Sequence, residues 1–240
     1  MESETVRTKK KKKSLGHMNK ASMGTSSFLH IFLILALLLG LAKPDPDSLQ
    51  DYCIADTKSS FYLNGVPCIN PNLATTAHFT TSALAKPGNT RANTFGFNVT
   101  LTTVANLPGI NTLGLSLARV DIAGNGIVPP HSHPRASEVT ICLKGSILVG
   151  FVDTSNRLYT QQLRPGESFV FPKGLIHFLF NVDSLNPALA ISGFSSQNPG
   201  AQVASLATFR SNPYIPDDVV KKAFQITTQD VMKIRKNLGG

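Results

Sequence analysis

The chain has 240 residues, 42% of them hydrophobic and 15% charged, which is typical of a folded protein with one or two domains. Its formal net charge is +9, but residues 1–42 contain seven of the 23 basic residues and two of the 14 acidic ones, so the remainder carries only +4. A nucleic-acid function would depend on the lysine run at 9–13 alone, and we therefore expect no nucleic-acid partner.

The N-terminal segment predicts secretion. Residues 28–42 form an apolar run that is shorter than the ~20 residues a membrane-spanning helix needs, and Gly40-Leu41-Ala42 offers small residues for signal-peptide cleavage. We predict a signal peptide at 23–42, cleaved near Ala42, and no membrane span after its removal. An uncleaved signal anchor is the alternative.

The basic stretch before this segment is longer than a signal peptide needs. We assign residues 1–22 to a basic leader, within which Met18 is an alternative start, and Met23 is another just beyond it. Our hypothesis is that residues 1–17 are an artefact of gene prediction. The mature protein is then a single domain at 43–240.

Two of the three cysteines lie near the start of the predicted mature chain. Cys53 and Cys68 are fifteen positions apart, and such a pair in a secreted protein indicates a disulfide. The third, Cys142, lies among apolar residues of a strand-like run, which predicts a buried free thiol. A redox or ligand role for Cys142 is the alternative.

Two other polar residues are candidate sites. Asn98-Val99-Thr100 is an acceptor sequence for N-glycosylation, so secretion predicts a glycan on Asn98. The sequence does not determine whether the neighbouring phenylalanines, Phe95 and Phe97, leave Asn98 accessible. His78 has no acidic residue or histidine nearby, and we interpret it as a structural residue.

From Thr112 onward the sequence has the pattern of consecutive short strands. The first contains alternating leucines followed by branched residues in the opposite phase, which predicts a β-bulge or a strand buried on both faces; these residues are Leu113, Leu115, Leu117, Val120 and Ile122. Further strands are expected at 145–153, 158–163 and 169–171, with turn sequences between them. Strands of this length with a turn about every 8–12 residues predict an all-β barrel or sandwich.

Four residues within these strands predict a metal site. His131 and His133 follow paired prolines, and residues two apart on an extended chain point to the same face. Glu138 begins one alternating run and His177 begins another, at a separation that suits an antiparallel strand returning to the first. Each histidine alone could be a surface or core residue. Because imidazole is the commonest metal ligand, the grouping favours a single ion bound by all four residues.

The C-terminal segment changes to a helical pattern. Acidic residues follow Pro216 and lysines precede Phe224, which complements the helix dipole, and Thr227 with Asp230 matches a capping box. We predict short helices at about 216–238. They either cover the end of the barrel or clasp a neighbouring subunit.

Two motifs in this sequence resemble those of the germins and germin-like proteins, plant members of the cupin superfamily. They are GIVPPHSHPRASE, from Gly126, and FPKGLIHFLFN, which ends at Asn181, and the resemblance extends from about Asp45 to the C terminus. It implies a cupin-type jelly-roll β-barrel of two Greek-key sheets, manganese held by three His and one Glu, secretion to the apoplast and cell wall, and a homohexamer built as a trimer of dimers. It also implies the same disulfide and favours helices that clasp a neighbour.

The predicted ligands also restrict the metal. Three imidazoles and a carboxylate, with no thiolate, disfavour a closed structural zinc site and suit manganese or ferrous iron. Copper and zinc stay open, because affinity order alone does not exclude them.

The resemblance suggests two substrates, superoxide and oxalate. Oxalate-oxidising germins hold their substrate with two asparagines, and the matching positions here are Ala118 and Val128, which cannot donate a hydrogen bond. Oxalate oxidation is therefore disfavoured, and manganese superoxide dismutase activity is the preferred enzymatic hypothesis. The alternative is a protein of the cell wall that acts without catalysis, as a receptor or a nutrient reservoir.

Overall fold

The computed structural model describes residues 30–33, 50–61 and 65–239. Residues 30–33 are helical, and the rest of the predicted leader, signal peptide and cleavage site lies outside the described residues. Within the described ranges, no helix has both the length and the apolar character needed to cross a membrane. A compact unit begins at Gln50 and contains all the elements discussed below.

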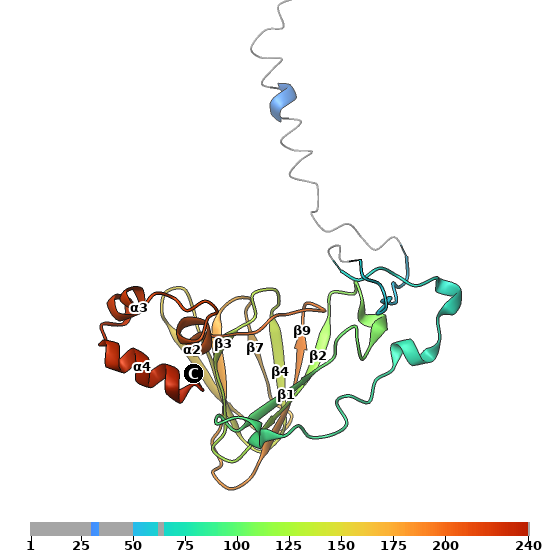
Figure 1. Ribbon diagram of the computed structural model, residues 1–240. Coiled ribbons are helices and arrows are strands. Elements are labelled where there is room, and N and C mark those ends of the chain that lie inside the picture. The colour runs from blue at the N-terminus through green and yellow to red at the C-terminus, as the bar shows by residue number, and fades with distance from the viewer. Residues whose placement is uncertain (1–29, 34–49, 62–64, 240) are drawn as a thin grey trace, which may run out of the picture. The chain divides into compact units, whose positions relative to one another are not determined.

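Two antiparallel sheets of five strands each dominate this described part of the chain, and they face each other (Figure 1). One sheet has the order β1-β2-β9-β4-β7 and the other the order β10-β3-β8-β5-β6. The strands are β1 Phe97–Leu101, β2 Ser116–Ile122, β3 Ile127–Ser132, β4 Glu138–Lys144, β5 Ile147–Val152, β6 Leu158–Leu163, β7 Ser168–Phe171, β8 Ile176–Asn181, β9 Ala188–Phe194 and β10 Gln202–Val203.

The strand pairing is nested. Strand β5 pairs with β6, β4 with β7, β3 with β8 and β2 with β9, so that the chain folds back along its own path. This is the connectivity of a jelly roll, in which a long hairpin is wrapped into two sheets. The predicted all-β barrel is confirmed.

The prediction for the first strand of this region was wrong in its start, and neither the predicted β-bulge nor burial of the whole strand on both faces is found. Strand β2 begins at Ser116, not at Thr112, and pairs with β9 in unbroken register. Thr112 has a positive φ of 63°, which is incompatible with an extended strand. The leucines at 113, 115 and 117 are 42–48% exposed, while Val120 and Ile122 face the core. The change in the hydrophobic alternation therefore has a simple cause. The leucines lie in an exposed loop or on the outer face of β2, whereas Val120 and Ile122 lie on its buried inner face.

The main core fills the space between the two sheets. On β4 the predicted alternation is confirmed, because Glu138, Thr140 and Cys142 are buried while Val139 is 52% exposed. Cys142 is a buried free thiol, and burial raises its pKa. The core cluster consists of Val120, Ile122, Val128, Cys142, Ile147, Val149, Leu163, Phe171, Leu179, Ala188 and Ala190.

Three α-helices form a second small core at one end of the sheets, next to β3 (Figure 1). Phe209, Val220 and Val231, one from each helix, are buried against one another. The two predicted helices are present, and the predicted capping box joins Thr227 and Asp230. The earliest helix was not predicted. The helices are α2 Ala204–Phe209, α3 Asp217–Phe224 and α4 Thr228–Asn237.

An irregular arm precedes β1, and its first part, drawn in cyan, lies on the side of the barrel away from these helices (Figure 1). It is fastened to the sheet where the backbone N–H of Gly88 donates to Asp121 Oδ2, 2.8 Å away. Arg119, which pairs with Asp121, also donates to the carbonyl of Leu84. The arm and the loop after β1 contain the 3₁₀ turns η1 Pro71–Leu73, η2 Thr76–Phe79, η3 Thr90–Ala92 and η4 Pro108–Ile110.

The disulfide between Cys53 and Cys68 closes the start of this arm. Because it spans fifteen residues, the chain-entropy model predicts that Cys53→Ser with Cys68→Ser lowers the free energy of unfolding by about 3 kcal/mol. Urea denaturation of the double variant and the wild type measures this difference. An unchanged midpoint at unchanged slope would show that the bond contributes nothing to stability.

Candidate metal centre

The four predicted ligands come from both sheets and meet between them. His131 lies on β3, His133 follows one residue after that strand, Glu138 opens β4, and His177 lies on β8. All four are buried, with exposed fractions of 1–8%. The centre is therefore part of the barrel interior and is built by strands far apart in sequence.

Strand pairing explains how distant residues arrive together. In the β3–β8 pair His131 is directly opposite His177, after a shift of register that begins at Val128 and includes the two prolines. The loops that carry the two motifs are also joined, because the backbone N–H of Gly174 donates to the carbonyl of His133 over 3.1 Å. Gly174 has φ +78°, a conformation that favours glycine at this turn.

The four side chains are close enough to share one ion. One ligand atom from each lies within 4.8 Å of the others, and this is the only such group in the described part of the chain. Glu138 Oε2 lies 3.0 Å from His133 Nε2 and 3.1 Å from His177 Nε2. The ring of His131 lies 4.1 Å from that of His177, centroid to centroid.

Hydrogen bonds to the main chain determine which nitrogen of each imidazole faces the centre. His131 Nδ1 lies 2.9 Å from the carbonyl of Pro129, His177 Nδ1 lies 2.9 Å from that of Leu175, and His133 Nδ1 is bonded to that of Gly200. A carbonyl can only accept, so each Nδ1 carries a proton and each Nε2 keeps its lone pair in the neutral ring. Metal-binding histidines are oriented in this way, and the donor set fits a divalent ion.

The electrostatics of the group are compatible with metal binding. Burial, together with the neighbouring His177 and His133, lowers the pKa of His131 to about 4, so its ring is neutral at pH 7. Burial also acts to lower the pKa of His133, but hydrogen bonds to Glu138 and Gly200 raise it overall. Burial would raise the pKa of Glu138, yet the imidazoles of His133 and His177, whose Nε2 atoms lie beside its Oε2, hold it well below its usual range. The carboxylate is ionised and available as an anionic ligand.

Apolar side chains enclose the centre. The ring of Phe171 stacks on His177 at 4.4 Å, and the ring of Phe194 meets His133 edge-on at 4.8 Å. Phe194 belongs to a small cluster with Ala118, which is fully buried, while Val128 is 5% exposed within the main core. Neither Ala118 nor Val128 offers a hydrogen-bonding side chain to a molecule in this region.

The loop that ends at Gly200, which the sequence analysis did not identify, orients His133 through a hydrogen bond to its Nδ1. Arg135 donates from Nε to the carbonyl of Asn198 over 2.7 Å and from Nη2 to Asn198 Oδ1 over 2.9 Å. These bonds fasten the segment that ends at Gly200, whose carbonyl is bonded to His133. Gly200 lies 67 positions from its partner and contributes only a backbone atom. No side-chain pattern could have revealed it.

The other candidate residues lie away from the centre. His78 is half-buried, and its Nδ1 accepts from the backbone N–H of Thr75 over 3.0 Å, which is a structural role. Asn98 is half-buried on β1, and Gly88 packs so tightly against it that no Cβ would fit there. A glycan on Asn98 would therefore require the arm around Gly88 to shift, and its presence stays a prediction.

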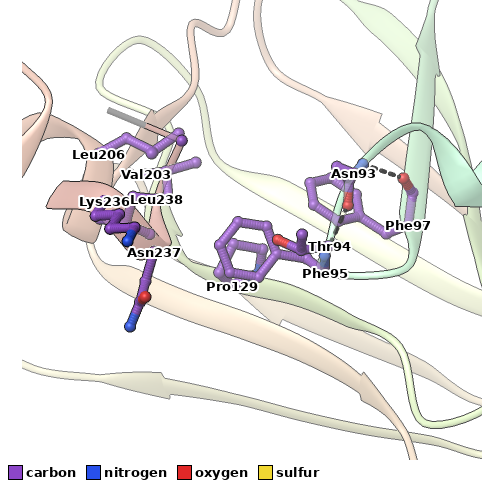
Figure 2. Close-up of a pocket in the computed structure, with 11 residues that line it drawn as sticks. Asn93, Thr94, Phe95, Phe97, Pro129, Val203, Leu206, Lys236, Asn237 and Leu238 are labelled. Atoms are coloured by element: carbon purple, nitrogen blue, oxygen red, sulfur yellow. Dashed lines mark hydrogen bonds between the residues drawn. The ribbon is translucent and has the colours of Figure 1, made fainter. Parts of the chain in front are cut away.

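A separate hollow of about 570 Å³ lies between the start of β1 and the helical end of the barrel. Figure 2 shows Phe95 and Pro129 on one side, with Leu206 and Lys236 on the other. Its walls are mainly apolar, and it contains none of the four grouped ligands. It is a surface feature distinct from the candidate metal centre.

Comparison with known proteins gives consistent results. The model of the cupin family matches residues 82–232. Germin-like protein subfamily 1 member 1 of Arabidopsis thaliana is 58% identical over 88% of this chain and 99% of its own length, and Germin-like protein 3-1 of Oryza sativa subsp. japonica is 55% identical over 88% and 96%.

Solved structures of oxalate oxidase are also similar. One, described in a study of the mechanism of oxalate oxidase, has a TM-score of 0.77 and 43% sequence identity, over 82% of this chain and 99% of the other. Another, in complex with the substrate analogue glycolate, has a TM-score of 0.77 and 42% identity over the same shares of the two chains.

Proposed function

Because the chain belongs to the germin-like proteins of the cupin family, we propose that it is a secreted manganese protein that dismutes superoxide. The observation that carries the proposal is the convergence of three imidazole Nε2 atoms and one carboxylate oxygen inside the barrel. The metal would be held by His131, His133, Glu138 and His177. Each residue supplies one ligand atom, and each imidazole is oriented by a backbone carbonyl.

The choice of manganese rests on the donor atoms. Nitrogen and oxygen ligands without a thiolate suit manganese or ferrous iron, and six-coordinate geometry would leave two positions for small molecules. Copper and zinc compete for such ligands by affinity order, so the metal supplied during folding matters. Cys142, the nearest thiol in sequence, does not belong to the ligand group in the described structure and does not alter this choice.

Superoxide dismutation suits this centre chemically. A bound manganese ion would supply one-electron oxidation and reduction, so that two superoxide anions and two protons yield dioxygen and hydrogen peroxide. Three neutral imidazoles and one carboxylate leave a divalent ion with a net positive charge, which attracts a small anion. The surrounding protein must only admit the anion and protons, and it needs no specific substrate-binding side chains.

Oxalate oxidation is disfavoured because, unlike superoxide dismutation, it needs side chains that bind the substrate. The similar solved structures are oxalate oxidases, one of them holding glycolate. In this chain the positions expected to hold such a substrate are Ala118 and Val128, which are buried and apolar. A dicarboxylate placed there would lose its hydrogen bonds to water without gaining replacements, which costs orders of magnitude in discrimination.

A second function is favoured by the enclosure of the centre. The ligands are at most 8% exposed, and Phe171 and Phe194 pack against two of the imidazoles. A metal held in this way could serve stability alone, in a cell-wall protein that acts by binding or storage. Slow metal exchange without turnover would be its signature.

We also propose secretion to the apoplast and cell wall and assembly as a homohexamer, a trimer of dimers. Helices α3 and α4 support the assembly, since Val219, Phe224 and Met232 are 52–63% exposed on them. Large exposed apolar side chains on these helices favour burial against another chain. Sedimentation at micromolar protein concentration tests the assembly.

Metal-loaded protein is expected to dismute superoxide and to leave oxalate unchanged. The two turnovers should be measured on protein whose manganese content has been quantified, with the metal-free protein as control. Oxalate turnover that depends on manganese would contradict the role given to Ala118 and Val128. Absence of both turnovers in fully loaded protein would favour the binding or storage function.

A further inference from the structure

A pair of buried hydroxyl groups lies directly behind Glu138. Thr140 is two residues further along β4 and points to the same side of the strand, and Ser192 lies opposite Thr140 on β9. Both residues are fully buried, with no exposed surface. The next inward pair on these strands is Cys142 with Ala190, which is apolar. The pair nearer the ligands is therefore polar, and the next pair along the strands is not.

The two hydroxyls form a directed chain of hydrogen bonds. Thr140 Oγ1 donates to Glu138 Oε1 over 2.7 Å and lies 2.7 Å from Ser192 Oγ. A threonine hydroxyl has a single proton, and an ionised carboxylate can only accept. The proton of Thr140 is thus given to Glu138, and Ser192 must be the donor to Thr140. A hydrogen bond to a charged group is stronger than one between neutral groups.

This chain of hydrogen bonds gives the two oxygens of the Glu138 carboxylate different partners. Oε1 is engaged by Thr140, while Oε2 faces the imidazoles of His133 and His177 at 3.0 and 3.1 Å. Without the hydroxyl, the carboxylate could rotate about its last bond, because that torsion is soft. A ligand held in one orientation binds a metal more tightly, since less freedom is lost on binding.

We propose that Thr140 and Ser192 are positioning residues, which hold Glu138 so that Oε2 alone is presented to the metal. The inference depends on the proposed metal centre. It adds a reason for the ligand geometry, because a carboxylate that binds through a single oxygen leaves more of the ion available to small molecules.

The test is a set of four variants whose manganese affinity is measured by chelator competition on metal-free protein. Thr140→Val removes the hydroxyl at nearly constant volume and should weaken manganese binding by about 10–100-fold. Thr140→Ser restores the hydroxyl and should remain within a few-fold of the wild type. Ser192→Ala leaves Thr140 able to donate and should weaken binding less. The matched control is Thr102→Val, which deletes a buried hydroxyl bonded to Leu117 on β2.

A spectroscopic measurement separates positioning from a merely structural role. The electron paramagnetic resonance spectrum of bound Mn(II) should change in Thr140→Val and return in Thr140→Ser, while Thr102→Val should match the wild type. If Thr140→Val fails to fold, the affinity and spectrum of Ser192→Ala decide, and wild-type values for both would overturn the proposal.

Two failures are distinguishable. Wild-type protein that binds no divalent metal would overturn the proposed function and, with it, the metal role of the hydroxyls. Wild-type binding with an unchanged affinity and spectrum in folded Thr140→Val would overturn the positioning role alone.

Discussion

Purified His177→Ala protein is expected to contain less than about a tenth of the manganese that the wild type binds per chain. His177 is 1% exposed, faces His131 across the strand pair and lies 3.1 Å from Glu138. Its removal takes away one of four ligands and leaves Glu138 with one fewer partner. Quantitative elemental analysis of protein purified with excess manganese measures the effect.

The matched control is His78→Ala. It removes a half-buried histidine that caps a 3₁₀ turn and does not belong to the ligand group. This variant should bind manganese like the wild type. Manganese content in His177→Ala equal to that of His78→Ala would contradict the assignment of His177 as a ligand.

Replacement of Phe171 by alanine is expected to lower the free energy of unfolding by about 3–5 kcal/mol. The ring is 1% exposed, stacks on His177 and contacts Phe169 at 5.3 Å between centroids. Its loss leaves a cavity between the two sheets, next to the candidate metal centre. Urea denaturation of metal-free protein measures the fold alone, because bound metal would add its own stabilisation.

Val170→Ala provides the control on the same strand. Val170 is 54% exposed and points to the outer face, so its truncation should cost little, below about 1 kcal/mol. Equal destabilisation by the two substitutions would contradict the placement of Phe171 in the core. A cost below about 1 kcal/mol for Phe171→Ala would contradict it as well.

The candidate ligands could be predicted from sequence because each is a side chain with distinctive chemistry in a regular strand pattern. His131 and His133 are two apart, and Glu138 and His177 each begin an alternating run. The alternating run that begins at Glu138 also places Thr140 on the same face of the strand, but nothing in the local sequence assigns Thr140 a role. Its partner Ser192 belongs to a strand that pairs with β4 only in the folded protein.

Other features depend on tertiary contacts that a local pattern does not encode. Gly200 bonds to His133 through a backbone carbonyl, which every residue possesses. Leu113 and Leu115 have the alternation of a strand, yet they lie in a loop, because Thr112 adopts a positive φ and the strand starts later. Helix α2 is a short segment without a capping side chain, so its start carries no sequence signal.

The most direct test of a four-residue metal centre is X-ray diffraction from crystals of manganese-loaded protein, measured on both sides of the manganese absorption edge. We predict one anomalous peak per chain, within bonding distance of the Nε2 atoms of His131, His133 and His177 and of Glu138 Oε2. The absence of such a peak in protein shown to contain manganese, or a peak bound by other side chains, would contradict the account.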